Sequence, residues 1–494
     1  MNQLLFPTLY QVNTRVWMTE LSQKLGRPAT LDDIPDTELD KLAGFGFDWI
    51  WFLSVWQTGK EGQRISRQNP GWRKEFKETL IDLTEEDIAG SGFAITRYSV
   101  SEHLGGDAAL ARLRNRLRER GLKLMLDFVP NHTGLDHDWI KDHTDFYISA
   151  GEQELEKEPE NFVRLGGDNR DIILAHGRDP FFPGWPDTAQ LNYGNPALQE
   201  AMINELIRIA GQCDGVRCDM AMLVLPDVFE RTWGIKCQLF WPEATRRVRN
   251  VNIEFRFMAE VYWDLEWTLL QQGFDYTYDK RLYDRLKEGH AKPVREHFFA
   301  GLDFQGKMAR FLENHDEPRV AADFPAGMHE AAAIITFLSP GLRFFHQGQF
   351  QGRRKRISPH LVRAPQEPVN INLEQFYNKL LDILHRPVFR TGNWQLLECN
   401  PAWEGNWSND NYISFLWQGD GEEKMLVVVN YSQSQSQCYV KLPIHNTGTG
   451  SWIFTDLING NVYERDGADL QVNGLYMDES AWKIYVFTLT RKKE

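Results

Sequence analysis

Four short apolar segments, each ending in acidic, amide or imidazole side chains, constrain the fold of this chain more than any other feature. They span residues 126–132, 215–219, 257–261 and 311–316. A (β/α)8 barrel carries its functional side chains at the carboxyl ends of its parallel strands. Four strand-like segments that deliver polar groups in chain order therefore indicate such a barrel, with one site at the mouth that these ends share.

The segment 215–219 reads Gly-Val-Arg-Cys-Asp, which places Arg217 and Asp219 two positions apart. Positions two apart share a face of a strand, so both side chains would point the same way. A neighbouring guanidinium lowers the pKa of a carboxyl group and keeps it ionised at neutral pH. An ionised, oriented carboxylate can act as a nucleophile. Taken alone, the pentapeptide fits an ordinary ion pair at a strand end equally well.

The N-terminal part of the chain alternates between strand and helix patterns. Residues 8–18 and 47–53 are rich in β-branched and aromatic side chains and predict strands, while residues 37–45 have leucines at helical spacing. This β-α-β repeat is typical of a parallel barrel. The long connection 54–91 interrupts the repeat, and connections of that length within a barrel are usually functional. We expect it near the active-site mouth.

In order and spacing, the four segments resemble the signature regions of glycoside hydrolase family 13, the alpha-amylase family. The resemblance implies a (β/α)8 TIM barrel formed by residues 1–132 and 194–392. It also implies a small domain inserted after the third strand, residues 133–193, and a C-terminal antiparallel β-sandwich, residues 393–494. In this last part, short strand-like runs are separated by Gly, Asn, Asp and Ser. This pattern independently favours an antiparallel β domain.

The resemblance assigns the chemistry of a retaining glycosidase, in which one carboxylate attacks and one carboxyl group is first acid, then base. Asp219 matches the nucleophile, with Arg217 keeping it ionised and aimed. Glu260 matches the general acid/base. It follows an apolar run, so we expect a partly desolvated site that raises its pKa. Asp316 matches the residue that binds the distorted sugar and stabilises the transition state.

Four further residues match family positions around the substrate. Tyr98 would stack under the sugar that is cleaved, while His132 and His315 would bind its hydroxyl groups. Asp127 would order the site without touching the substrate. The alternatives are that Tyr98 is an ordinary core or rim residue and that each histidine is satisfied by a neighbouring backbone group.

The chemistry itself requires no cofactor, but many family members bind a structural calcium ion. The match places Asn131 among its ligands, with others in the inserted segment and a backbone carbonyl just after Asp219. Calcium takes six to eight oxygens. The alternative is that Asn131 is a purely structural hydrogen-bonding residue. Met222 and Leu223 stand where family amylases often carry Lys-His, and this removes a lysine that commonly contacts sugar on the leaving-group side.

The net charge and composition indicate which classes of binding partner this chain favours. The net charge of −14 argues against nucleic acid, which favours a basic surface, and is compatible with a neutral sugar substrate. We see no segment long enough to span a bilayer and no signal peptide, so we expect a cytoplasmic protein without a membrane partner. Five cysteines without metal-type spacing predict thiols rather than a disulfide framework. The sequence specifies no oligomeric state.

The leading interpretation is an alpha-amylase-like retaining hydrolase that cleaves α-glucosidic bonds of oligosaccharides. Hydrolysis and transfer share the first half-reaction. A transglycosidase or isomerase acting on a small α-glucoside such as maltose, trehalose or sucrose is therefore the alternative. A catalytically inactive carbohydrate-binding protein ranks third, because both Asp219 and Glu260 are present.

Overall fold

The computed structural model describes residues 6–166, 171–421, 423–443 and 450–492 of the 494-residue chain. Contacts divide the chain into two compact units. The first unit comprises Tyr10–Tyr278 and Lys355–Gln366, and the second comprises Met1–Leu9, Asp279–Arg354 and Glu367–Glu494. In the described part of the chain, no helix is both long enough and apolar enough to cross a membrane.

Eight parallel strands close into a barrel, which confirms the predicted fold class. The strands are β1 (Thr8–Asn13), β2 (Trp49–Leu53), β5 (Lys123–Phe128), β10 (Gly215–Cys218), β11 (Arg256–Ala259), β12 (Tyr276–Tyr278), β13 (Met308–Arg310) and β14 (Leu342–His346). Their order around the barrel is β1-β14-β13-β12-β11-β10-β5-β2. Every residue of β2 is buried, as expected for a parallel strand whose two faces are both covered.

The predicted strand 8–18 is wrong beyond Asn13. There β1 ends and α1 (Thr14–Leu25) begins, with the Asn13 side chain accepting a hydrogen bond from the backbone amide of Val16 at 3.3 Å. An asparagine in this position satisfies a free amide of the first turn and so favours a helix start. The apolar side chains that suggested a longer strand form the buried face of α1 instead.

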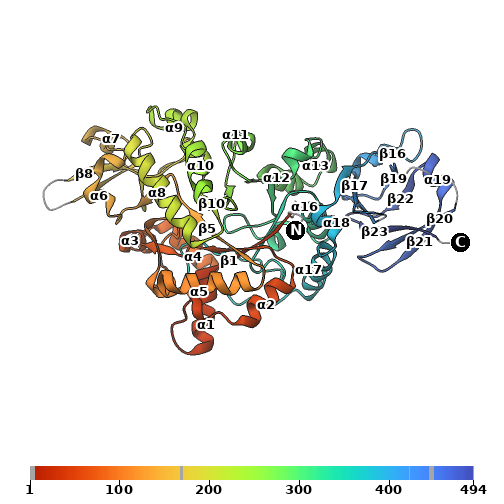
Figure 1. Cartoon of the computed structure of the whole chain (residues 1–494), viewed down its shortest axis with the longest axis horizontal. Helices are drawn as coiled ribbons and strands as arrows, with labels where there is room; N and C mark the ends of the chain where they lie inside the picture. The colour runs from red at the N-terminus through yellow and green to blue at the C-terminus, as the bar shows by residue number, and fades with distance from the viewer. Residues whose placement is uncertain (1–5, 167–170, 422, 444–449, 493–494) are drawn as a thin grey trace. The chain divides into compact units, whose positions relative to one another are not determined.

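The first unit surrounds its barrel strands with helices. Besides α1 they are α2 (Asp36–Gly44), α3 (Lys60–Gln68), α4 (Pro70–Thr79), α5 (Gly106–Glu119), α8 (Pro196–Gln212), α9 (Pro226–Trp233), α10 (Trp241–Val251) and α11 (Glu266–Gln271). Helix α5 lies against β5, and α8 contacts both α5 and α10 (Figure 1). The long connection after β2 holds α3, α4 and the antiparallel pair β3 (Trp56–Thr58) and β4 (Ile95–Val100).

Between β5 and α8 the chain leaves the barrel pattern. It forms β6 (His132–Gly134), α6 (Trp139–Asp142), α7 (Glu152–Lys157), β7 (Phe162–Leu165), β8 (Ile172–Ala175) and β9 (Thr188–Gln190). Two antiparallel ribbons, β6–β9 and β7–β8, hold this inserted segment together. Because β6–β9 joins its first and last strands, the segment returns to the strand end from which it leaves.

The second unit combines the remaining helices with two antiparallel sheets. The helices are α12 (Lys280–Glu288), α13 (Ala291–His297), α14 (Leu302–Gln305), α15 (Val320–Asp323), α16 (Met328–Phe337), α17 (Ile371–Leu384), α18 (Pro387–Thr391) and α19 (Gly467–Val472). The C-terminal strands are β15 (Asn393–Leu396), β16 (Cys399–Pro401), β17 (Tyr412–Gln418), β18 (Lys424–Asn430), β19 (Ser436–Val440), β20 (Ser451–Asp456), β21 (Val462–Asp466), β22 (Leu475–Glu479) and β23 (Ile484–Arg491).

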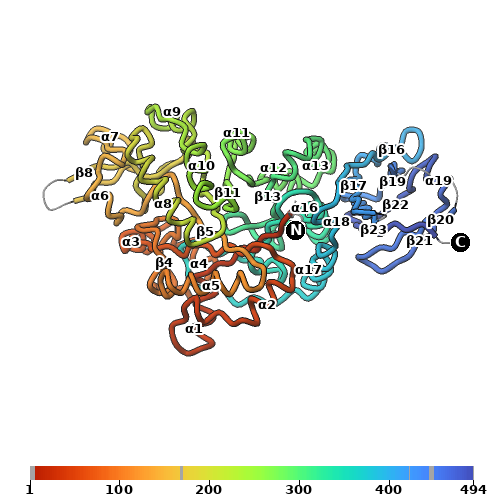
Figure 2. Tube along the Cα trace, in the orientation of Figure 1, coloured from red at the N-terminus to blue at the C-terminus, as the bar shows by residue number. Residues whose placement is uncertain are grey.

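Those strands form a six-stranded sheet, β15-β17-β18-β23-β20-β21, and a three-stranded sheet, β16-β19-β22. Figure 2 traces them through the blue end of the chain. Tyr412 and Leu426 of the larger sheet share one core with Cys438 and Met477 of the smaller sheet. This is the packing of a β-sandwich and confirms that part of the predicted fold. The compact units cut the chain elsewhere than at residues 133, 194 and 393, so those domain boundaries stay predictions.

Candidate active site

Strand register brings the ends of β5, β10 and β11 to one level. Cys218, the last residue of β10, pairs with Phe128 on one side and with Ala259 on the other. Asp219 and Glu260 come next, and their backbone amides donate to Phe128 O at 2.8 Å and to Cys218 O at 3.0 Å. The register thus places two motif carboxylates on neighbouring strand ends.

A single guanidinium joins these carboxylates. Arg217 is fully buried and donates from Nη1 to Asp219 Oδ1 at 2.7 Å and from Nη2 to Glu260 Oε2 at 2.6 Å. Its Nη1 also lies 3.8 Å from Asp127 Oδ1. Burial opposes the charge, but the surrounding acidic groups, Glu260 foremost, raise the pKa of Arg217, so it stays a cation. Such a planar fork fixes the relative position of the carboxylates that it holds.

Two more donors orient Glu260, which is buried. The backbone amide of Met220 donates to Oε2 and the Tyr262 hydroxyl donates to Oε1, both at 2.8 Å. Met220 has a φ of +41°, a left-handed conformation that side-chain-bearing residues rarely adopt. This turn, directly after Asp219, aims the amide at Glu260.

Asp127 lies at the end of β5, where it ties neighbouring strands together. Its Oδ2 accepts from the Ser54 amide at 3.1 Å, and its carbonyl oxygen accepts from Trp56 Nε1 at 2.7 Å. Burial raises the pKa of the Asp127 carboxyl to about 7, even though Arg217 opposes the shift. These contacts suit a residue that orders the site.

The His132 side chain is buried. Burial lowers the pKa of His132 to about 3, so its ring is neutral and able to donate one hydrogen bond and accept another.

The Tyr98 hydroxyl donates to Val129 O at 3.0 Å and accepts from Val129 N at 2.9 Å. The Tyr98 ring is buried and packs against Trp56 and Phe128. This environment favours the core-tyrosine alternative over a ring that stacks under a sugar.

An aromatic residue that the sequence did not single out lies at the cluster instead. Phe93 is half-buried, and its ring centroid lies 5.2 Å from the guanidinium carbon of Arg217. Trp51 contacts the same guanidinium at 5.4 Å. Phe93 falls outside the four segments and two residues before β4, so no local pattern marks it.

The second unit carries the remaining motif residues. His315 Nε2 lies 3.0 Å from Asp316 Oδ2, and the Asp316 side chain is partly exposed. The amides of Asp316 and Glu317 donate to Asn314 Oδ1 at 2.8 and 2.9 Å, which sets the turn after β13. Glu313 is buried and bound to Arg319 at 2.8 Å, a structural ion pair.

The structure therefore brings together Asp127, Arg217, Asp219 and Glu260 in the first unit, and His315 and Asp316 in the second. That all of them serve one reaction stays a prediction.

The oxygens around Asn131 do not fit a calcium ion. Gln190 is fully buried and its Nε2 donates to Asn131 O at 2.9 Å, Asn131 Oδ1 at 3.0 Å and Leu191 O at 3.0 Å. A cation at Asn131 would need these oxygens, and an amide nitrogen already holds them. This arrangement suits the alternative, in which Asn131 is a structural hydrogen-bonding residue.

The carbonyls after Asp219 are also engaged. Met220 O accepts from Leu223 N at 2.9 Å, and Ala221 O accepts from Trp241 Nε1 at 2.9 Å. Among the residues that the structure describes, no group of three or more His, Cys, Asp or Glu side chains is placed to hold a metal ion.

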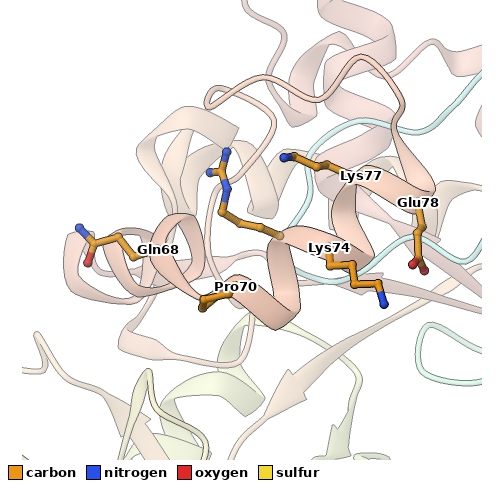
Figure 3. A pocket seen from close by; sticks show the side chains of 6 residues that line it. Gln68, Pro70, Lys74, Lys77 and Glu78 are labelled. Carbon is orange, nitrogen blue, oxygen red and sulfur yellow. The ribbon is translucent and has the colours of Figure 1, made fainter.

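A surface hollow of about 560 Å³ lies along α4. Its lining residues are Gln68, Pro70, Arg73, Lys74, Lys77 and Glu78. Lys74 and Lys77 extend in different directions from the helix (Figure 3), so they do not converge on one anion. The hollow contains none of the motif carboxylates.

Comparison with known proteins agrees with this architecture. The model of the alpha-amylase catalytic domain matches residues 36–375. Alpha-amylase MalA of Haloarcula japonica is 23% identical over 366 residues, 70% of this chain and 44% of that protein. An alpha-glucosidase of Apis mellifera is 24% identical over 313 residues, 54% of this chain and 55% of that protein. The chain thus spans about half the length of these curated relatives.

A solved structure, an alpha-amylase from Geobacillus thermoleovorans complexed with acarbose, superposes with a TM-score of 0.67 and 18% identity, covering 100% of both chains. At that identity the likeness supports the fold. The family model, in contrast, spans more than half of the sequence and all four motif segments. The chain therefore belongs to the alpha-amylase family.

Proposed function

We propose that this protein is a retaining glycoside hydrolase that cleaves α-glucosidic bonds. The single observation that carries the proposal is the buried guanidinium of Arg217, which holds Asp219 at 2.7 Å and Glu260 at 2.6 Å. Two carboxyl groups that are held side by side, but have different neighbours, suit the two roles of double displacement.

In the first half-reaction, Asp219 attacks the anomeric carbon while Glu260 transfers its proton to the departing oxygen. The bond to the leaving group breaks as the bond to Asp219 forms. In the second, Glu260 takes a proton from water, the water oxygen attacks the anomeric carbon, and the Asp219 carboxylate leaves. Two inversions give net retention.

Other motif residues would support the oxocarbenium-like transition state. Asp316 would accept hydrogen bonds from sugar hydroxyls that strengthen as charge develops. His132 and His315 would bind further hydroxyls, and Asp127 would hold the end of β5. The expected substrates are α-glucans or small α-glucosides, in line with the named activities of the relatives.

The decisive experiment compares Asp219→Asn and Glu260→Gln with the exposed controls Asp227→Asn and Glu254→Gln. Each catalytic variant should lose at least about a thousandfold in kcat/KM on maltodextrin while remaining folded. The controls should match wild type. Near-normal turnover by either catalytic variant would falsify the assignment.

Product stereochemistry separates the two carboxyl roles. Proton NMR should show the α anomer first. With α-glucosyl fluoride as donor, azide should restore turnover of Glu260→Gln and yield α-glucosyl azide, because azide needs no general base. Azide should not restore turnover to the α product in Asp219→Asn. A β product from wild type would exclude double displacement.

A further inference from the structure

A second surface hollow, which we call the α3–α4 hollow, gathers basic side chains in an otherwise acidic chain. Its volume is about 360 Å³. Its lining residues are Lys60, Gln63, Arg64, Arg67, Gln68, Arg73 and Glu85. It adjoins the hollow along α4, because Gln68 and Arg73 line both. Four of the seven lining residues are cations, although the whole chain carries a net charge of −14.

The sequence places these cations along two consecutive helices. Lys60, Arg64 and Arg67 stand four and three residues apart on α3, so they lie along one stripe of that helix. Asn69 ends α3, and its side chain caps the first turn of α4. The turn brings Arg73 of α4 back to the stripe, where its Nη1 donates to Arg67 O at 2.9 Å. Cations from both helices therefore line one hollow.

The carboxylates near these cations do not balance them. Glu61 pairs with Arg64. Glu85 is shared, because its oxygens lie 2.7 Å from Arg73 Nη1 and 3.8 Å from Arg67 Nε. In the part of the chain that the structure describes, no other carboxylate lies within 4 Å of the four cations. Four cations against two carboxylates leave two positive charges unbalanced.

Two of the cations also have unused donors. Among the described residues, the side chains of Lys60 and Arg67 donate no hydrogen bond, and Arg67 Nε is a buried donor without a partner. The Arg67 side chain is 34% exposed, so a solute in the hollow can reach its guanidinium. The Glu85 side chain is 51% exposed. Ion pairs at such exposure contribute little to stability, so a bound anion can compete with Glu85 for the arginines.

The helix that closes the hollow adds positive charge instead of cancelling it. Arg356, from the basic run at residues 353–356, pairs with Glu75 of α4. Lys74 and Lys77 of the same helix (Figure 3) have no carboxylate within 4 Å among the residues that the structure describes. Because clustered charge of one sign attracts the opposite ion, the surface around the hollow favours anions.

We propose that the α3–α4 hollow binds the phosphate group of a small phosphorylated metabolite. A guanidinium fork can donate to two phosphate oxygens at once, which makes arginine the preferred side chain for this group. A phosphate monoester carries up to about two negative charges near neutral pH, which complements the two unbalanced positive charges. The volume lies within the range of about 300–1,000 Å³ that is typical of small-molecule sites.

This phosphate site uses none of the motif residues and does not rest on the proposed function. Its test is therefore a binding measurement on the full chain. Isothermal titration calorimetry with glucose 6-phosphate, in dilute buffer because salt screens exposed charges, should show one saturable site per chain. Arg67→Gln should weaken binding at least about tenfold, because it removes a fork that holds phosphate.

Lys60→Gln and Lys74→Gln make a matched pair of variants. Both side chains are exposed lysines, so neither change should disturb folding, and each removes one positive charge. Lys60 lines the α3–α4 hollow, whereas Lys74 lines only the neighbouring one. Lys60→Gln should weaken binding roughly threefold, while Lys74→Gln should stay within about twofold of wild type.

A parallel titration with inorganic phosphate separates the two sources of this group. Inorganic phosphate should bind more weakly than glucose 6-phosphate and respond to the variants in the same order. Saturable binding of inorganic phosphate without binding of glucose 6-phosphate would overturn the phosphorylated metabolite as the ligand. No saturable binding of either probe up to about 10 mM would overturn the site. Equal weakening by Lys60→Gln and Lys74→Gln would also overturn it, because net charge alone would then explain the binding.

Discussion

The barrel strand ends and the inserted segment both bury polar side chains, but they compensate them differently. At the strand ends, the buried Arg217 cation binds Asp219 and Glu260. In the inserted segment, the neutral Gln190 amide satisfies the oxygens of Asn131. The strand ends therefore depend on a buried ion cluster, whose members are costly to remove one at a time, whereas neutral hydrogen bonds satisfy the buried oxygens of Asn131.

Removing the shared cation should produce the largest effect. Arg217→Met removes the cation that two buried carboxylates share, so we expect the free energy of unfolding to fall by about 3–5 kcal/mol. We also expect kcat/KM to drop about a hundredfold or more, because the donor that fixes the two carboxylates relative to each other is gone. Denaturant titration and kinetics measure the two effects.

Arg217→Lys keeps the charge but not the planar fork, and should fall between wild type and Arg217→Met. Arg246→Met removes an exposed arginine paired with Glu243 and serves as the control. If Arg217→Met is as stable as wild type, the contacts of Arg217 with Asp219 and Glu260 do not hold the strand ends together.

A smaller effect is expected from Asp187, a buried acidic residue of the inserted segment. Burial raises the pKa of its carboxyl from 3.8 to about 7, and within the described residues its Oδ2 has no hydrogen-bond partner. The folded state therefore holds this proton more tightly than the unfolded state. Its contribution to stability is full below about pH 4 and is lost as the pH rises through about 7, by at most about 4 kcal/mol.

Asp187→Asn should remove that pH dependence, which melting temperatures from pH 4 to 8 would reveal. The exposed Asp227→Asn control should keep the wild-type slope. If Asp187→Asn also keeps it, the inserted segment compensates Asp187 in some other way, and its contrast with the Arg217 cluster weakens.

The smallest effect concerns Gln190. Gln190→Glu replaces the donating nitrogen by an oxygen that faces three carbonyl oxygens, so we expect a loss of about 1–3 kcal/mol. Added calcium should restore part of the melting temperature of this variant, since the oxygens now suit a cation. Wild type should show no change with chelator or with calcium. A chelator-induced fall in the wild-type melting temperature would contradict the Gln190 assignment.

Sequence reasoning located the barrel and the residues of its strand ends because those signals are local. Arg217 and Asp219 stand two apart after an apolar run, and the pleat of one strand sets their common direction. Glu260 follows the next apolar run in the same way. Residues 14–18 show the limit of local pattern. Their side chains predict a strand, but the capping side chain of Asn13 favours the start of a helix there.

Other features depend on how distant segments meet. The sequence leaves Tyr98 open as a sugar-stacking ring or a core residue, and only the structure shows that its hydroxyl is engaged by Val129 and that Phe93 lies against Arg217. Gln190 reaches Asn131 across the β6–β9 ribbon. No local pattern in either segment predicts such contacts, because the paths of long connections determine them.

Local chemistry along the chain was thus enough to identify parallel strands, their acidic ends and the family that shares them. Periodicity and strand termini are properties of a few consecutive residues, which makes them readable without coordinates. The pairing of Asp219 with Glu260 through one cation and the amide at Asn131 required the folded molecule. Each depends on register or loop path between residues far apart, and that information is spread over the whole chain.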